Sequence, residues 1–213
     1  MNAKRDQDGD RDDRDRTLAE YHRRRDFSRT AEPRGSAGDR GPEPRFVVQI
    51  HDATRMHFDF RLEADGVLKS WAVPRGPSTD PNDKRLAMPT EDHPLEYREF
   101  EGVIAPGEYG AGPVIIWDEG TWRPERDRPV AESLRRGHLS FRLRGRKLRG
   151  GFALTRFRGD SPGEEEAWLL VKRSDAGASH EGAGTPDPNR ARSARTGRTL
   201  RQVAAEEDES HPA

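Results

Sequence analysis

The residues of this chain that could carry out chemistry are concentrated in residues 46–61, which read FVVQIHDATRMHFDFR. Side chains of a β-strand alternate between two faces, so residues two apart share a face. On this pattern one side carries two imidazoles, a carboxylate and a guanidinium: His51, His57, Asp59 and Arg61. Two histidines and a carboxylate can hold a divalent metal and leave positions open for water or substrate oxygens. With the flanking arginine, the combination suits a metal acting on a phosphate.

The opposite side of the same stretch is apolar, which predicts two half-buried strands. Its residues are Phe46, Val48, Ile50, Met56, Phe58, Phe60 and Leu62. Residues 52–55 (Asp-Ala-Thr-Arg) are compatible with a turn, so the two strands are expected to form a hairpin. That hairpin would return His51 to the side of His57 and Asp59, and we interpret these three residues as the metal ligands.

Further residues are candidates for contacts with phosphate. His93 lies in the proline-broken stretch Lys84–Pro94 (KRLAMPTEDHP), which we interpret as a long functional loop. There it could serve as a fourth metal ligand, a general acid or an oxyanion donor. Four arginines surround the same segments and could bind phosphate through paired N–H groups: Arg55, Arg61, Arg75 and Arg85.

Two alternatives stay open at this point. His57 and Asp59 with the later His93 also fit the two-histidine, one-carboxylate triad of Fe(II) oxygenases on β-barrels. A non-catalytic DNA-binding module is the other alternative, although it leaves the His/Asp face unexplained. A single histidine in a strand is usually a surface or hydrogen-bonded residue, and the grouping of three candidates with Arg61 favours a site. The Gly107–Gly112 run lacks the GK[ST] ending of a P-loop, so nucleoside triphosphate binding is unsupported.

Composition predicts one folded domain between two polar ends. Of the 213 residues, 31% are hydrophobic and 36% are charged, which is too polar for a compact globule throughout. Residues 1–16 are almost wholly charged or amide residues, and the chain after Ser174 is rich in Ala, Gly, Ser, Asp and Arg. Such segments bury too little surface to offset the entropy of ordering. We therefore expect disordered tails at residues 1–16 and 176–213 around a domain at residues 17–175.

Other features of composition limit the class of protein. The absence of cysteine excludes disulfides and thiolate metal sites. No apolar run of about 18 residues occurs and no apolar region follows the charged N-terminus, so we expect a soluble, cytoplasmic protein with no membrane association. The formal net charge is −1, but residues 121–158 contain twelve Lys or Arg and three acidic residues. A segment this basic favours a polyanionic partner.

The remaining pattern predicts an all-β fold. Residues 17–27 could form a short N-terminal helix with Thr17 as its N-cap. Short strands are predicted at Val67–Val73, Val114–Asp118, Gly120–Arg123, His138–Leu143, Lys147–Thr155 and Trp168–Lys172. Many short strands separated by turns, with little helix between them, indicate a barrel or a sandwich.

Three long segments of the chain resemble the 3′-phosphoesterase domain of bacterial DNA ligase D. They read HDATRMHFDFRLEADGVLKSWAVPRGPS, EDHPLEYREFEGVIAPGEYGAGPVIIWDEGTW and WLLVKRSD, and the similarity runs from about residue 21 to residue 175. The resemblance implies a small β-barrel with its active site in a crescent-shaped groove. It also implies an enzyme that uses Mn²⁺, with Zn²⁺ or another divalent ion as alternatives. Such an enzyme removes a terminal 3′ ribonucleoside and then the 3′-phosphate, leaving a 3′-OH for the repair of double-strand breaks by end joining.

The resemblance implies roles for individual residues. The metal ligands would be His51, His57 and Asp59, and the phosphate contacts would be Arg61, Arg85 and His93, with His93 at the transition-state phosphate. Glu91 and Tyr97 match further active-site positions, and Arg25, Asp26 and Glu32 match a functional N-terminal arm.

The chain departs from the family at Arg75, where the family commonly has lysine. Lysine and arginine differ in reach and in hydrogen-bond geometry, so the balance between the two activities could differ. No ligase KxDG motif occurs, and we expect a stand-alone, monomeric version. Its substrate would be DNA with a 3′ ribonucleotide or 3′-phosphate end, and separate ligase, polymerase and Ku proteins would be its partners in repair.

Overall fold

The computed structural model describes residues 17–35, 41–159, 161, 163–179, 185 and 187–210. The charged tail expected at residues 1–16 lies outside this part of the chain. The strands are β1 (Arg45–Asp52), β2 (Met56–Ala64), β3 (Val67–Val73), β4 (Lys84–Pro89), β5 (Gly102–Ile104), β6 (Gly112–Pro124), β7 (His138–Gly145), β8 (Arg149–Arg158) and β9 (Ala167–Lys172). The helices are α2 (Ala19–Arg23), the 3-10 helix η1 (Leu95–Glu99), α3 (Val130–Arg135) and α4 (Leu200–Ser210). None of these described helices is long and apolar enough to cross a membrane.

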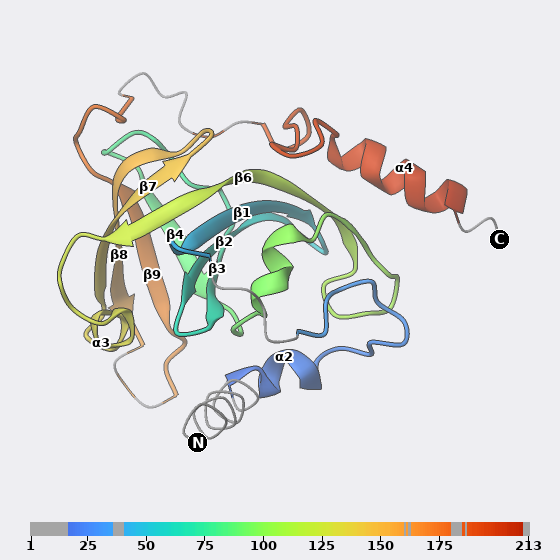
Figure 1. Ribbon diagram of the computed structural model, residues 1–213, viewed down its shortest axis with the longest axis horizontal. Coiled ribbons are helices and arrows are strands. Elements are labelled where there is room, and N and C mark those ends of the chain that lie inside the picture. Colours follow the sequence, from blue (N-terminus) through green and yellow to red (C-terminus); the bar gives the residue numbers. More distant parts are fainter. Residues whose placement is uncertain are drawn as a thin grey trace.

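Eight of the described strands close into an antiparallel barrel (Figure 1). Their order is β1-β2-β3-β4-β9-β8-β7-β6, and pairing between β6 and β1 completes the ring. The length of β6 makes this possible, because its first residues pair with β5 and its last residues pair with β7. Strand β1 pairs along β6 from Val114 to Thr121. The predicted all-β barrel and the short N-terminal helix are confirmed, but the helix spans Ala19–Arg23 and its N-cap is Leu18 instead of Thr17.

The β1–β2 hairpin supplies much of the barrel interior and also the face that carries the chemistry. The interior-facing residues Phe46, Val48, Ile50, Phe58, Phe60 and Leu62 are at most 2% exposed and belong to one apolar cluster. The register pairs His51 with His57 and Gln49 with Asp59, so the predicted hairpin is confirmed. Because neighbouring side chains of a strand point to opposite faces, the His/Asp face lies on the outside of the barrel.

A second, smaller apolar cluster packs on this outer surface. It consists of Leu18, Tyr21, Val67, Leu68, Leu95, Tyr97, Phe100, Ile104 and Val114. Its members come from the α2 region, from η1 and from the outer surface of the strands. His93, just before η1, is joined to β3 by two backbone hydrogen bonds with Leu68, of 2.8 and 3.1 Å. The α2 region and η1 therefore form a wall beside the His/Asp face.

The interpretation of Lys84–Pro94 as a loop is wrong for its first half. Residues 84–89 form β4, which pairs with β9 along four residues and with β3 at Trp71 and Ala72. In this strand only Ala87 is buried, so the sequence lacks the alternation that signals a half-buried strand. Pro89 ends the strand. Residues 90–94 then form a connection to η1 that carries Glu91 and His93.

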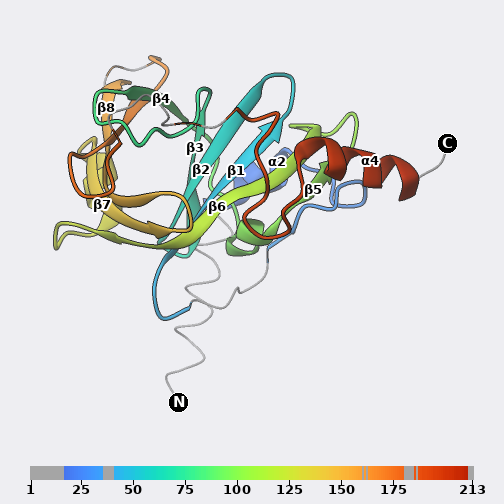
Figure 2. The same cartoon turned by 90° about the horizontal axis from the view of Figure 1, so that it is seen from above.

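The structure also differs from the expectation of a disordered tail at residues 176–213. Residues 200–210 form α4, and Ala191, Leu200 and Val203 are 6%, 5% and 3% exposed in the same apolar cluster as the barrel interior. Figure 2 shows α4 beside β5 and β6, away from β7 and β8. Leu200 and Val203 are three residues apart and so share one helix face. A segment of low average hydrophobicity can thus still place a few apolar side chains where they are buried.

We predict that Leu200→Ala lowers the free energy of unfolding by about 2–5 kcal/mol, the usual cost of truncating a buried leucine. The neighbouring Arg201 is exposed, and Arg201→Ala should change stability by less than about 0.5 kcal/mol. Urea denaturation followed by tryptophan fluorescence measures both variants. Equal stabilities for the two variants would contradict the packing of α4 on the barrel.

Candidate metal and phosphate site

The outer face of the β1–β2 hairpin brings two imidazoles and a carboxylate together. The ring centroids of His51 and His57 are 4.9 Å apart. Asp59 lies close to both rings, with Oδ2 3.5 Å from Nδ1 of His51 and Oδ1 3.6 Å from Nε2 of His57. One ligand atom of each residue lies within 4.8 Å of the others. Two ligands that each bind one ion at about 2.0–2.2 Å lie roughly 3–4 Å apart, so this donor set fits a single divalent metal.

Backbone carbonyls fix the orientation of both imidazoles. Nε2–H of His51 donates to the carbonyl of Gly110 (2.6 Å), and Nδ1–H of His57 donates to the carbonyl of Arg55 (2.8 Å). In the neutral ring the other nitrogen carries the lone pair, and in both residues that nitrogen faces Asp59. Metal-ligating histidines are commonly held by a hydrogen bond from the remote nitrogen. The orientation of both rings therefore suits metal binding.

The electrostatics of the three groups favour a positive charge between them. Burial alone would raise the pKa of Asp59, but the charge of Arg61 and the hydrogen bonds of His51 and His57 together outweigh burial, and the pKa lies well below its usual range. Burial alone would lower the pKa of His57, but the hydrogen bond and charge of Asp59 raise it above its usual value. An ionised carboxylate thus lies beside an imidazole that binds a proton more readily than a free histidine does. A bound metal would supply that charge in place of the proton.

Arg61 holds the carboxylate of Asp59 in position. The Arg61 side chain is 3% exposed, and its Nη2 lies 3.1 Å from Oδ2 of Asp59. Its Nε donates to Oε1 of Gln49 (2.8 Å), and its Nη1 donates to Oγ of Ser70 (3.0 Å). Gln49 in turn donates to the backbone carbonyl of Tyr97 (3.2 Å). Each guanidinium nitrogen therefore has a partner, and the network ties the hairpin to β3 and η1.

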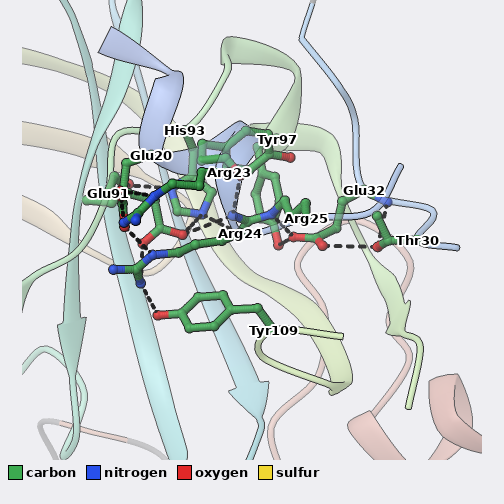
Figure 3. Close-up of polar contacts among 12 residues, drawn as sticks. Glu20, Arg23, Arg24, Arg25, Thr30, Glu32, Glu91, His93, Tyr97 and Tyr109 are labelled. Atoms are coloured by element: carbon green, nitrogen blue, oxygen red, sulfur yellow. Dashed lines mark hydrogen bonds and ion pairs between the residues drawn. The ribbon is translucent and has the colours of Figure 1, made fainter. Parts of the chain in front are cut away.

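A second buried arginine reaches the site from the segment that follows α2 (Figure 3). Arg25 is 3% exposed in its side chain and donates to Glu32 (2.9 Å) and to Glu91 (3.0 Å). Its Nη2 lies 3.3 Å from Nε2 of His93. The hydroxyl of Tyr97 donates to Glu32 (2.8 Å). Because a buried charge needs partners, these contacts join the N-terminal segment to the 90–94 connection and to η1.

His93 is 3% exposed and is held as a neutral ring. Nδ1–H donates to the backbone carbonyl of Glu91 (2.8 Å), which leaves Nε2 to accept the N–H of Arg25. Burial and the positive charges of Arg61 and Arg25 hold the pKa of His93 well below its usual range. Among the described residues, His93 is not part of the cluster whose ligand atoms could share one ion.

These residues border one pocket of about 520 Å³. The candidates from the sequence that line it are Arg25, His51, Arg55, His57, Asp59, Arg61, Glu91, His93 and Tyr97. Glu32 lies behind this lining, bonded to Arg25 and Tyr97. The structure thus gathers ten candidates at one place, from the hairpin, the N-terminal segment, the 90–94 connection and η1.

Three candidates lie away from the pocket lining. Arg85, on β4, pairs with Asp83 at 2.7 Å. Arg75 is exposed just after β3. Asp26 is exposed and accepts the backbone N–H of Ser28 (3.0 Å).

Sequence reasoning missed three side chains of the site. Gln49 could have been found, because alternation places it on the same strand face as His51. Tyr109 lines the pocket, and Arg24 donates to its hydroxyl. No local pattern relates residue 24 to residue 109, so that contact follows only from the fold.

We predict that His57→Ala removes Mn²⁺ binding while the barrel stays folded, because the His57 side chain is 21% exposed and lies outside the core. Calorimetric titration with Mn²⁺ measures binding, and circular dichroism measures folding. The matched control is His138→Ala, since His138 is an exposed histidine bonded to Thr155 and Ser140. The control should bind Mn²⁺ like the wild type. Unchanged affinity in His57→Ala would exclude the hairpin as the metal site.

Several known proteins are similar to this chain. The multifunctional non-homologous end joining protein LigD of Pseudomonas aeruginosa is 53% identical over 163 residues, which cover 76% of this chain and 19% of that protein. The multifunctional non-homologous end joining DNA repair protein LigD of Mycobacterium tuberculosis is 48% identical over 144 residues, or 67% of this chain and 19% of that protein. LigD of Mycolicibacterium smegmatis is 41% identical over 164 residues, which cover 74% of this chain and 21% of that protein. The chain spans about a fifth of the length of these relatives.

The family match covers the part of the site that follows the N-terminal segment. A family model described as the DNA Ligase D 3′-phosphoesterase domain matches residues 49–156. This range contains the three metal-ligand candidates, Arg61 and the 90–94 connection with η1. The match and the relatives together show that the chain belongs to the DNA ligase D 3′-phosphoesterase domain family.

Proposed function

We propose that this chain is a metal-dependent phosphoesterase that heals the 3′ ends of DNA. As a phosphodiesterase it removes a 3′-terminal ribonucleoside, and as a phosphomonoesterase it removes the remaining 3′-phosphate. The product is a 3′-OH end suited to ligation during double-strand break repair. Mn²⁺ is the proposed cofactor and Zn²⁺ the alternative, because imidazole and carboxylate ligands suit both ions.

The observation that carries this proposal is that a metal-ligand cluster and two buried arginines border the same pocket. The ligand set alone would also suit an Fe(II) oxygenase. Arg61 and Arg25 add positive charge and N–H donors, which match the non-bridging oxygens of a phosphate. Membership of the family favours the same chemistry. Consumption of oxygen together with a 2-oxo acid would favour the oxygenase instead.

The buried residues have distinct roles in the proposed reaction. When bound, the metal would polarise a phosphate oxygen and lower the pKa of water. Arg61 keeps Asp59 ionised and in place, and it stabilises negative charge that develops on the phosphate. Arg25, on the N-terminal segment, also stabilises negative charge that develops on the phosphate. Glu32 and Glu91 fix the plane of the Arg25 guanidinium.

His93 and Tyr97 complete the wall. The Tyr97 hydroxyl is bonded to Glu32, so its role is to position the carboxylate that holds Arg25. An entering phosphate would compete for the N–H of Arg25 that His93 now accepts. The negative charge of the phosphate would also favour protonation of His93. His93 could then donate to a non-bridging oxygen or protonate the leaving oxygen.

The candidates outside this wall are proposed to contact DNA near the pocket. Arg55 is exposed at the end of the hairpin and lines the pocket rim. Arg75 follows β3, Arg85 lies on the neighbouring strand β4, and Asp26 adjoins Arg25 in the sequence. We propose that the three arginines bind backbone phosphates and that Asp26 orders the N-terminal segment through Ser28.

A second surface supports DNA as the partner. A pocket of about 760 Å³ on β6, β7 and β8 is lined by four arginines, namely Arg123, Arg142, Arg144 and Arg149. Arg123 faces Arg142 directly across two strands, and Arg144 faces Arg149. Like charges in such positions repel each other, although Glu125 lies 3.5 Å from Arg142. Backbone phosphates of a duplex would offset this repulsion.

We also propose that the protein is a monomer and that its partners in repair are separate ligase, polymerase and Ku proteins.

We predict metal-dependent removal of the 3′ group from a labelled primer–template that ends in one ribonucleotide. The reaction is followed by gel electrophoresis with Mn²⁺, Mg²⁺, Zn²⁺ or no metal. A second substrate with a 3′-phosphate end tests the phosphomonoesterase step. Loss of activity in chelator and its recovery with Mn²⁺ are expected. Full activity in exhaustive chelator would remove the metal from the mechanism.

We predict that His93→Ala lowers the single-turnover rate by about 10²–10³-fold, the usual cost of losing one transition-state donor. The affinity for Mn²⁺ should stay near that of the wild type, because His93 lies outside the ligand cluster. Electron paramagnetic resonance titration measures the affinity beside the kinetics. A collapse of metal binding would make His93 a ligand and would revive the alternative triad of His57, Asp59 and His93.

A further inference from the structure

Tyr109 is an exposed aromatic residue at the edge of the metal pocket. It lies in the glycine-rich connection between β5 and β6, and 49% of it is exposed. The other large hydrophobic residues exposed in the described part of the chain are Leu86 and Phe157. Neither of these lines the pocket, whereas Tyr109 does. An exposed ring beside a phosphate-binding pocket has the chemistry of a surface for a nucleobase.

The ring of Tyr109 is held from the N-terminal segment by Arg24. The Arg24 guanidinium carbon lies 4.7 Å from the ring centroid, and its Nη1 donates to the tyrosine hydroxyl. Arg24 also pairs with Glu20 (2.6 Å) and with Glu91 (3.3 Å). Figure 3 shows Tyr109 beside Arg24, and the Arg25 guanidinium carbon lies 5.9 Å from the ring centroid. The ring is thus oriented by contacts that leave about half of the residue open to solvent.

The position of Tyr109 relative to the metal ligands is fixed by the next residue. The carbonyl of Gly110 accepts Nε2–H of His51. A Cβ at Gly110, whose φ is +76°, would lie 3.2 Å from Cε1 of His51. The backbone after Tyr109 therefore lies against a candidate metal ligand, and Tyr109 borders the same pocket as the ligand cluster.

The size of the pocket indicates which base would meet this ring. At about 520 Å³ it falls in the range of small-molecule sites, roughly 300–1,000 Å³. A volume of this size suits a ligand as large as one nucleotide. Its inner wall is formed by the buried charged residues that suit the phosphate. The part of the substrate left to meet the exposed ring is the nucleoside beyond the scissile phosphate.

We propose that Tyr109 stacks on the base of the 3′-terminal nucleoside, the group released by the phosphodiesterase step, with Arg24 holding the ring in place. This inference rests on the proposed function and identifies the subsite for its leaving group. Stacking of one base on an aromatic side chain contributes roughly 5- to 150-fold to affinity. The 3′-phosphate substrate has no nucleoside beyond its phosphate, so Tyr109 contributes nothing to the phosphomonoesterase step.

The test compares Tyr109→Ala, Tyr109→Phe and the wild type on two primer–templates, one ending in a ribonucleoside and one in a 3′-phosphate. Tyr109→Ala should lower kcat/KM by roughly 5- to 150-fold on the first substrate and leave the second within about twofold. Tyr109→Phe keeps the ring and loses only the hydroxyl that Arg24 holds, so it should lose less activity than Tyr109→Ala on the first substrate. Manganese titration and circular dichroism confirm that the metal site and the fold are intact.

A binding measurement in chelator removes chemistry from the comparison. Fluorescence anisotropy measures the affinity for the ribonucleoside end and for the same end with an abasic terminal sugar. The wild type should prefer the end that carries a base, and Tyr109→Ala should lose that preference. Equal loss on both catalytic substrates, or a preference that survives in Tyr109→Ala, would overturn the stacking role. A wild type inactive on both substrates would instead overturn the proposed function, and the inference with it.

Discussion

The buried ion pair between Arg61 and Asp59 is the interaction on which the rest of the site depends. A charge removed from water is tolerated only when partners replace its hydration. Asp59 can therefore stay ionised on the barrel wall because Arg61 lies 3.1 Å away. Arg61 in turn is bonded to Gln49 and Ser70 on two other strands. The geometry of the candidate metal ligands is thus secured by the same sheet register that closes the barrel.

The N-terminal segment is held by contacts with the site more than by its own helix. A five-residue helix such as α2 has little stability alone. Tyr21, which is fully buried, packs in the outer apolar cluster, and Arg25 is bonded to Glu32 and Glu91. The pocket wall and the N-terminal segment are therefore held by the same contacts. A substitution of Glu91 would therefore remove a partner of Arg25, which lies 66 residues away in the sequence.

The predictable parts of this protein are those encoded by neighbouring residues. Alternation over residues 46–62 was sufficient to derive the hairpin, the barrel-facing apolar side and the three ligand candidates. Strand β4 escaped prediction because only Ala87 among its side chains is buried, and α4 because average composition concealed Leu200 and Val203. The contacts of Arg25 and Arg24 join segments more than sixty residues apart. No local pattern encodes such contacts, and the resemblance to a family supplied only part of them.

One hairpin supplies both core residues and the candidate ligand face. This limits the changes in sequence that the two strands can accept. Substitutions on the outer face alter the ion pairs and the chemistry of the pocket, and substitutions on the inner face alter the packing of the core. Insertion or deletion of a single residue within β1 or β2 is different, because a shift of one position exchanges the two faces of a strand. It would turn Phe58 and Phe60 toward water and carry Asp59 and Arg61 into the barrel. Variation in length is therefore confined to the turn at residues 53–55, and the two strands can diverge only by replacement.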